Sequence, residues 1–205
     1  MGFHGKMQWQ GEVPSFWHEY KCIFIPVPRT GTTSMSKIIP KPFHPHPDIL
    51  EVKEVIPKKK FDAYFKFAFV RNPWDRIVSL YLRSRQQGFK RLSLYLRAQQ
   101  QDFKSFVYSC KMASSHCAWP RSKKYQLDWL CDEDNNLLMD FVGRFENLQN
   151  DFNHVCKEIG LPQQKLGHKN NSGGHDYRDY YDSELIDVVH RNFKKDIEYF
   201  GYEFI

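Results

Sequence analysis

The sequence has no segment that would carry the chain into or across a membrane. It contains no run of about 18 apolar residues, which excludes a transmembrane helix. Residues 1–10 contain neither the apolar core of a signal peptide nor a small-residue cleavage site. We therefore expect a cytoplasmic protein without a membrane span.

Cysteine and histidine are present, but not in the spacing that a disulfide framework or a metal site requires. The five cysteines are an odd number without CxxC spacing, which argues against a disulfide framework or a zinc knuckle. We expect buried free thiols, with a Cys110–Cys117 disulfide as the alternative. The nine histidines lack metal-ligand spacing, and His44 and His46 lie in a proline-rich segment where no helix can align them. The sequence thus predicts no metal site.

The sequence is not poor in aromatic residues, as a disordered chain would be. Aromatic residues make up 16% of the sequence and apolar residues 41%, which is enough for a folded core and excludes global disorder. No internal repeat or low-complexity tract stands out. The length of 205 residues suits one domain. We expect an N-terminal extension over residues 1–19 and a single domain over residues 20–205.

Positive charge is concentrated in the first half of the chain. The formal net charge is +6, from 30 basic and 24 acidic side chains. Residues 1–100 hold 17 basic and 7 acidic groups, or +10, whereas residues 101–205 hold 13 and 17, or −4. A basic half indicates an anionic partner, although an ordinary soluble surface has the same pattern. No RNA-binding or helix-turn-helix signature occurs, and we expect no nucleic-acid partner.

Predicted strands alternate with predicted helices. The apolar runs at 21–27 and 64–70 predict buried strands, and residues 137–142 predict a third. The other periodic segments predict helices, at 35–39, 48–60, from Pro73 onward, 102–113, 122–131, 146–159 and 183–200. This alternation is typical of an α/β protein whose helices cover a small parallel sheet, here of four or five strands.

The loop after the first predicted strand has the composition of an anion site. It reads Pro-Arg-Thr-Gly-Thr-Thr-Ser from residue 28 and opens a helix, where converging N–H groups and the helix dipole favour an anion. Gly31 lets the backbone approach a ligand closely, and Arg29 adds a permanent charge. Further hydrogen-bond donors are the hydroxyls of Thr30, Thr32, Thr33 and Ser34. An ordinary βα turn is the alternative.

A second strand–loop–helix unit reads Phe-Val-Arg-Asn-Pro-Trp-Asp-Arg-Ile-Val-Ser from residue 69. Arg71 lies at the carboxyl end of its strand, the edge at which α/β proteins bind ligands. Asn72 and Pro73 suit the N-cap and the first position of the helix. Arg71 and Ser79 could hold one phosphate together. In the alternative interpretation Arg71 pairs with Asp75, and Ser79 is a plain helix-surface residue.

The first loop departs from the ATP-binding loop of P-loop enzymes. That motif, GxxxxGK[ST], has a lysine after its second glycine and a Ser or Thr that holds magnesium. Here Thr32 follows Gly31, and the cation is Arg29. Asp140 could pass for the magnesium-binding acidic residue of such enzymes. Without the lysine we interpret it as a strand-end residue.

Together the two units resemble the nucleotide-binding signatures of sulfotransferases, with the carbohydrate sulfotransferases of family 2 as the branch most similar. The first resembles the loop that binds the 5′-phosphosulfate of 3′-phosphoadenosine 5′-phosphosulfate (PAPS). The second resembles the segment whose Arg and Ser bind the 3′-phosphate. Residues 140–148 (DFVGRFENL) and 196–204 (DIEYFGYEF) agree as well. One departure is Arg29, where the family usually has Lys; Arg keeps the charge but presents a bidentate fork.

The resemblance implies a P-loop-NTPase-like three-layer fold and in-line transfer of a sulfuryl group from PAPS to a hydroxyl, without a metal. Arg29 and the loop amides then neutralise the transferring group and stabilise the leaving phosphate. His46 is the candidate general base, because a His precedes the corresponding strand by a similar distance in related sequences. His44 is the main alternative; a distant acidic residue, or no role for either histidine, also stays open.

The resemblance extends to further candidate residues. Arg144 is expected either to contact the nucleotide or to pair with Glu146. Lys169 and Ser172 lie where the family has a loop over the nucleotide, so they are candidates for phosphate or adenine contacts; a solvated connector is the alternative. Trp74 is interpreted as a packing residue. The lysine run at 58–60 is interpreted as a solvated face, unless the acceptor is an acidic glycan.

We expect the acceptor to be a hydroxyl of a glycan or a small molecule, with tyrosine and a lipid-linked sugar also open. The sequence does not determine the oligomeric state. Three other functions stay as alternatives. These are an ATP-dependent small-molecule kinase with a degenerate phosphate loop, a non-catalytic polyanion-binding module, and a sulfotransferase fold inactivated by Arg29.

Overall fold

The centre of the molecule is a sheet of three parallel strands. The structure, a computed structural model, describes residues 12–42, 46–86, 102–112, 125–167 and 176–205. Within these ranges the strands are β1 (Cys22–Ile25), β2 (Phe65–Val70) and β3 (Phe141–Arg144), in the order β1-β2-β3. The register pairs Cys22 with Phe65, and Phe67 with Phe141. The α/β class with a parallel sheet is confirmed, although the described sheet has three strands where the sequence predicts four or five.

The first two strands lie where their apolar runs predict them, and the third does not. Every residue of β1 is buried, as expected for a strand covered on both faces. β3 begins at Phe141, four residues later than the predicted start, because the beginning of the apolar run pairs elsewhere. Leu137 forms an isolated antiparallel bridge with Cys131, and the Leu138 N–H donates to the Leu130 carbonyl. The carboxyl end of β3 is therefore Arg144.

Helices account for most of the remaining described chain. The α-helices are α1 (Ser15–Glu19), α2 (Thr32–Met35), α3 (Ile49–Val55), α4 (Lys58–Ala63), α5 (Pro73–Gln86), α7 (Phe103–Met112), α8 (Leu148–Glu158), α9 (Ser183–Asn192) and α10 (Lys194–Phe200). Short 3₁₀ helices are η2 (Leu127–Trp129), η3 (Phe145–Asn147) and η4 (Tyr177–Tyr180). The predicted helix at 48–60 is two helices, separated at Pro57. The predicted C-terminal helix is interrupted at Phe193.

The start of α5 has the capping residues expected from the sequence. The Asn72 side chain accepts a hydrogen bond from the Trp74 N–H at 3.0 Å, and Pro73 is the first residue of α5. The Asp182 side chain caps α9 by accepting from the Leu185 N–H. Such caps satisfy N–H groups that a helix leaves without an internal acceptor.

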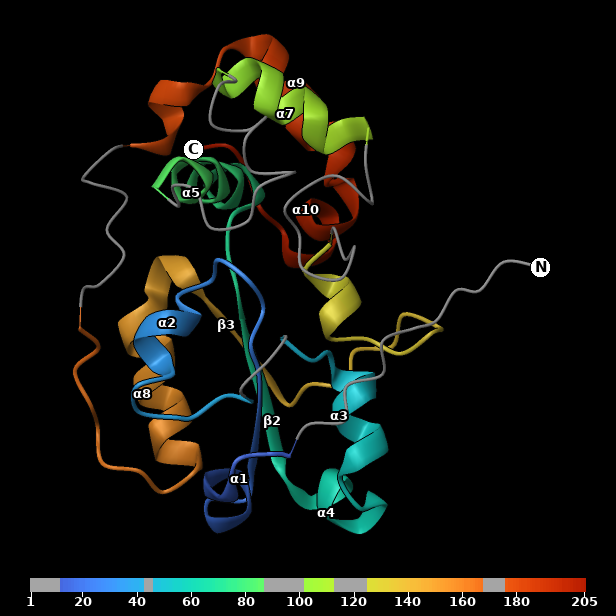
Figure 1. The fold of residues 1–205 in the computed structure, drawn as a ribbon, viewed down its shortest axis with the longest axis vertical. Helices are drawn as coiled ribbons and strands as arrows, with labels where there is room; N and C mark the ends of the chain where they lie inside the picture. Colours follow the sequence, from blue (N-terminus) through green and yellow to red (C-terminus); the bar gives the residue numbers. More distant parts are fainter. Residues whose placement is uncertain (1–11, 43–45, 87–101, 113–124, 168–175) are drawn as a thin grey trace.

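The helices form layers around the sheet. Figure 1 shows α2 and α8 on one face and α3 and α4 on the other, with β2 passing upward into α5. Beyond that end of the sheet lie α5, α7, α9 and α10, which pack on one another. Because the strands are parallel, the loops that follow β1 and β2 meet at the same edge.

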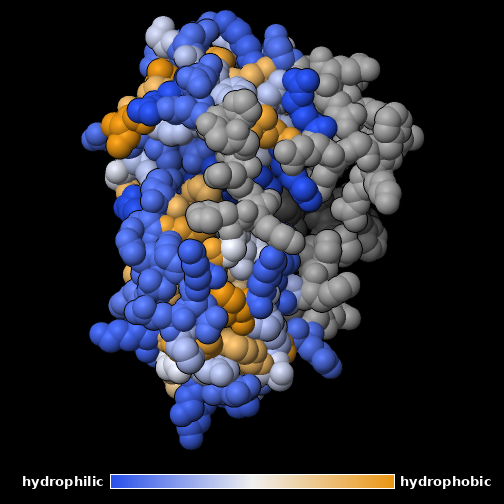
Figure 2. All heavy atoms as spheres, turned by 90° about the vertical axis from the view of Figure 1, so that its left-hand side faces the viewer, coloured by the Kyte–Doolittle hydropathy of each residue, from blue (hydrophilic) through white to orange (hydrophobic). Residues whose placement is uncertain are grey.

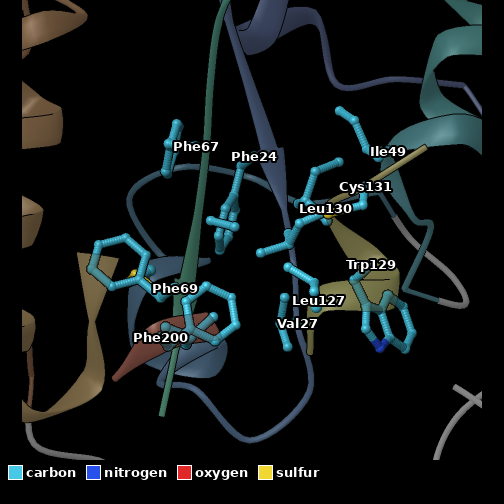
Figure 3. Packing of buried hydrophobic residues seen from close by; sticks show 14 of the residues in the cluster. Phe24, Val27, Ile49, Phe67, Phe69, Leu127, Trp129, Leu130, Cys131 and Phe200 are labelled. Carbon is cyan, nitrogen blue, oxygen red and sulfur yellow. The ribbon is translucent and has the colours of Figure 1, made fainter. Parts of the chain in front are cut away.

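The core fills the space beneath this edge. The rings of Phe24 and Phe67 stack across β1 and β2 with centroids 5.1 Å apart, and Figure 3 shows Val27 beside Leu127 of η2. Trp17 of α1 is fully buried and its Nε1–H donates to the Pro40 carbonyl, so part of the predicted N-terminal extension packs into the core. The backbone of Gly143 packs directly against the Phe69 ring. A Cβ at this position would come within 2.5 Å of the ring.

The molecular surface is mainly polar. Figure 2 shows hydrophilic side chains over most of the coloured part of the face that is on the left in Figure 1, with apolar areas between them. None of the helices in the described ranges combines the length and the apolar character needed to cross a membrane. Cys22, Cys131 and Cys156 are buried free thiols, as predicted. Cys117 and the side chain of Cys110 lie outside the described part.

Candidate functional site

The loop between β1 and α2 is held in an unusual backbone conformation. Arg29 has φ 71° and Gly31 has φ 82°, both in the left-handed region that L-residues other than glycine rarely adopt. A Cβ at Gly31 would also come within 2.9 Å of the Leu148 side chain. The left-handed turns lead the chain into α2, whose first N–H groups have no acceptor within the helix. The φ angle therefore favours glycine at position 31, and a Cβ there would displace the end of the Leu148 side chain.

Two of the loop hydroxyls serve the loop itself. Thr30 and Thr32 each donate from Oγ1 to the Val27 carbonyl at 2.9 Å, and both are buried. Among the described residues Thr33 and Ser34 form no such side-chain bond; Thr33 is exposed and Ser34 is buried. The predicted set of four equivalent donors thus divides into two residues that shape the loop and two whose hydroxyls are uncommitted in the described structure.

Arg29 joins the two predicted anion-binding segments. Its Nε donates to Ser79 Oγ at 3.1 Å, and its Nη2 donates to the same Oγ at 2.6 Å and to the Ser79 carbonyl at 3.0 Å. Ser79 is only 4% exposed, so it is not a plain surface residue of α5. The two units predicted separately therefore form a single site.

Arg71 is fixed on three sides. Its Nε and Nη2 donate to the two carboxylate oxygens of Asp75 at 2.7 and 2.6 Å, its Nη1 donates to the Arg29 carbonyl at 3.3 Å, and the Phe145 ring lies 3.9 Å from its guanidinium carbon. The pairing with Asp75 is the alternative left open above. It accounts for part of the guanidinium, which has five N–H donors, and it orients the fork beside Arg29.

The site has an excess of positive charge. Burial, followed by the neighbouring cations Arg71 and Arg83, lowers the pKa of Arg29 to about 10, so the group stays charged at neutral pH. Arg71 has a carboxylate partner in Asp75. In the described part of the chain Arg29 has none. A partly buried cation beside a second arginine is electrostatically satisfied by an anion from outside the chain.

His46 lies under the same edge of the sheet. Its Nδ1 is 2.7 Å from the Pro26 carbonyl, in the segment that leads to the loop, and its ring contacts the edge of Trp129. Because a carbonyl can only accept, Nδ1 carries the hydrogen, and in the neutral form of the ring Nε2 is the acceptor nitrogen. Its backbone has φ 44°. His44 lies outside the described residues.

The remaining candidates are dispersed. Arg144 donates from Nη2 to the Phe200 carbonyl at 2.6 Å and stacks on Tyr202, so of its two alternatives the pairing with Glu146 does not form, and the nucleotide contact stays a prediction. Glu146 instead accepts from the Asn72 N–H and the Tyr202 hydroxyl. Lys169 and Ser172 lie outside the described part of the chain.

Asp140 lies far from the two loops, so it is not placed to act on a phosphate there. It precedes β3, at the opposite edge of the sheet from the two loops, and its carboxylate pairs with Lys66 at 2.8 Å. The lysine run at 58–60 starts α4 before β2, also at that edge. In the residues that the structure describes, no group of three or more His, Cys, Asp or Glu side chains could hold a metal ion.

Two contributors to the site are not identified by the sequence. Phe145 covers Arg71 and also approaches Gly31, where a Cβ would lie 3.3 Å from its ring. Gln126 is hydrogen-bonded to the Arg71 backbone. Phe145 lies in the segment at 140–148 that carries part of the family resemblance, but the sequence does not indicate its contact with Arg71. No local pattern indicates what Gln126 does.

Comparisons with known proteins show which family the sequence and the fold resemble. The sequence matches the model of the sulfotransferase family over residues 17–203. An uncharacterized protein of Archaeoglobus fulgidus is 29% identical over 129 residues, which cover 62% of this chain and 93% of that protein. The crystal structure of mouse sulfotransferase SULT7A1, complexed with PAP, has a similar fold, with a TM-score of 0.50 and 14% identity over 89% of this chain and 88% of that one.

Proposed function

The chain belongs to the sulfotransferase family and is a PAPS-dependent enzyme; we propose that it sulfates a hydroxyl of a carbohydrate, with His46 as the general base. PAPS supplies the sulfuryl group when it is bound. In the proposed reaction the acceptor oxygen forms a bond to sulfur as the bond from sulfur to the phosphate oxygen breaks, and the acceptor proton passes to His46 Nε2.

The observation that carries this proposal is the state of Arg29. It is a partly buried guanidinium without a carboxylate partner in the described structure, and it connects to Ser79 beside Arg71. Positive groups that are already oriented stabilise a negatively charged transition state without a reorganisation cost. Arg29 is suited to the charge that develops on the leaving phosphate. Arg71 and Ser79 are suited to the 3′-phosphate.

The proposed role of His46 is supported by its tautomer. The Pro26 carbonyl holds Nδ1–H, so a proton abstracted from the acceptor would go to Nε2. The contact also connects the base to the segment that bears Arg29, only three residues further along. The carbohydrate acceptor is supported by the similarity of the motifs to family 2, and a small-molecule hydroxyl is the alternative.

The kinase and polyanion alternatives have less support. The position that would carry the lysine of an ATP loop is Thr32, and its hydroxyl is committed to Val27. Asp140, the candidate magnesium ligand, pairs with Lys66 at the other edge of the sheet. A non-specific polyanion surface does not require the contact of Arg29 with Ser79 or the fixed orientation of Arg71.

The experiment that tests the proposal is calorimetric titration with 3′-phosphoadenosine 5′-phosphate (PAP), the product nucleotide. We expect the wild-type protein to bind PAP and Arg71→Ala to bind it at least about thirtyfold more weakly, as for loss of a charged hydrogen-bonding partner. Arg191→Ala, on the exposed side of α9, is the matched control and should bind normally. A wild-type protein that does not bind PAP contradicts the proposal.

A further inference from the structure

A cluster of buried polar side chains lies behind the two loops and touches both. Its members are Gln126, Arg76 and Asp196, which are 0%, 1% and 0% exposed. They come from the turn before η2, from α5 and from α10. The hydrogen bonds of Gln126 and Arg76 are directed to the backbone of the two loops.

Gln126 makes both of its amide hydrogen bonds to one residue. Its Oε1 accepts from the Arg71 N–H at 2.9 Å, and its Nε2 donates to the Arg71 carbonyl at 2.9 Å. Arg71 follows the last residue of β2, where the pairing with β1 has already ended. The amide therefore takes the place of a neighbouring strand at this residue, by satisfying its N–H and its carbonyl together.

Asp196 fixes Gln126 in turn. Its two carboxylate oxygens accept from the N–H groups of Gln126 at 2.8 Å and Leu127 at 3.0 Å. Its partner Arg76, 3.9 Å away, donates from Nε to the Pro28 carbonyl at 3.2 Å. The cluster thus links the residue before Arg29 to the backbone of Arg71, through one carboxylate and one amide.

Stability alone is a weak explanation for these groups. A buried ion pair loses much of its attraction to desolvation, and apolar residues of similar volume often stabilise a core equally well. The paired hydrogen bonds of Gln126 and Asp196 fix geometry more strictly than apolar packing does. Here the geometry concerned is the spacing of two arginines that act on one ligand.

We propose that Gln126 is a positioning residue for the 3′-phosphate site: by holding the Arg71 peptide, it sets the guanidinium where it can meet a phosphate while Arg29 meets the other end of the same nucleotide. This inference rests on the proposed function, because it assumes that Arg71 binds the 3′-phosphate.

The test compares two nucleotides that differ only in that phosphate. The dissociation constant of 5′-AMP divided by that of PAP measures how much the 3′-phosphate contributes to binding. We expect Gln126→Leu, which removes both hydrogen bonds, to lower this ratio by about tenfold, since small displacements of a positioning group have effects of this order or larger. Gln126→Met, which keeps most of the side-chain volume without adding a charge, should lower it by a similar factor.

Matched controls separate positioning from general loss of stability. Trp17→Phe removes the hydrogen bond that the buried Trp17 side chain of α1 donates to the Pro40 carbonyl. Helix α1 lies away from the two loops. It should lower the melting temperature and leave the nucleotide ratio unchanged. If Gln126→Leu does not fold, the comparison uses Gln126→Met. An unchanged ratio in a folded Gln126 variant overturns the inference, whereas failure of the wild-type protein to bind PAP defeats the proposed function first and the inference with it.

Discussion

At the scale of single residues, Arg29 carries both the charge and the backbone strain of the site. Its guanidinium is partly buried without a carboxylate partner among the described residues, and its φ is 71°. Both features cost stability in the ligand-free protein. Such costs are typical of positions kept for binding rather than for folding.

Arg29→Met tests this interpretation, because it removes the charge and keeps most of the side-chain length. We expect PAP affinity to fall at least about thirtyfold. We expect the free energy of unfolding of the ligand-free protein to change by less than about 1 kcal/mol, because relief of the buried charge offsets the lost bonds to Ser79. Chemical denaturation and calorimetry measure the two quantities. A large loss of stability would show that Arg29 is mainly structural.

His46→Ala separates proton transfer from nucleotide binding. Loss of a general base lowers kcat by about 10²–10⁴-fold, whereas the phosphate-binding groups are unaffected and the dissociation constant of PAP should be unchanged. His18→Ala is the control; His18 lies beside Tyr64 at the other end of the sheet. Full activity in His46→Ala, measured by formation of PAP with a working acceptor, rejects His46 as the base.

At the scale of elements, the turn into α2 is the most constrained connection. Gly31 and Gly160 both have positive φ, but a Cβ at Gly160 would meet nothing within 4 Å, whereas at Gly31 it would press on Leu148. Gly160→Ala should therefore destabilise the protein by about 1 kcal/mol through its φ angle alone. Gly31→Ala should cost up to about 1 kcal/mol more, because the end of the Leu148 side chain must also move aside. Equal losses in thermal denaturation would contradict the close approach of Gly31 to α8.

How much of the fold follows from the sequence depends on the element. The runs around β1 and β2 predict their strands because fully buried parallel strands are continuously apolar. Nothing in the run at 137–142 indicates where the pairing with β2 begins. Leu137 and Leu138 pair with residues 130–131 before β3 starts. Asn72 predicts the start of α5 correctly, because capping depends on local geometry.

The candidate site is predictable only in part, for a related reason. Arg29, Gly31, Arg71 and Ser79 stand in two local motifs, so the sequence identifies them. The bond between Arg29 and Ser79 joins residues 50 positions apart, and Gln126 reaches Arg71 across 55. No periodicity or motif reports such distant pairs. They depend on how α5 and α10 pack over the end of the sheet.

At the scale of the whole molecule, the basic first half and the acidic second half meet at one site. The loops that bear Arg29 and Arg71 lie in the first half, and their support from Phe145, Gln126 and Asp196 comes from the second. A ligand that binds these loops should therefore stabilise the entire fold. At a PAP concentration about 100 times its dissociation constant, we expect the free energy of unfolding to rise by about 2.7 kcal/mol.

The control for this thermal shift is Arg71→Ala at the same PAP concentration. Its melting temperature should hardly respond, because the ligand no longer binds appreciably. Heparin, a polyanion without a nucleotide, distinguishes a general basic surface from a nucleotide site. A salt-sensitive shift with heparin that exceeds the shift with PAP would favour the polyanion-binding alternative.

The most direct test of the account follows sulfate labelled in PAPS. The protein is incubated with labelled PAPS and a panel of carbohydrates, small alcohols and tyrosine peptides, and labelled product and PAP are measured together. We predict that the wild-type protein labels a carbohydrate with one PAP formed for each sulfate transferred, and that His46→Ala labels none while still binding PAP. Phosphoryl transfer from ATP to these acceptors, with no transfer of label from PAPS, would contradict the central claim.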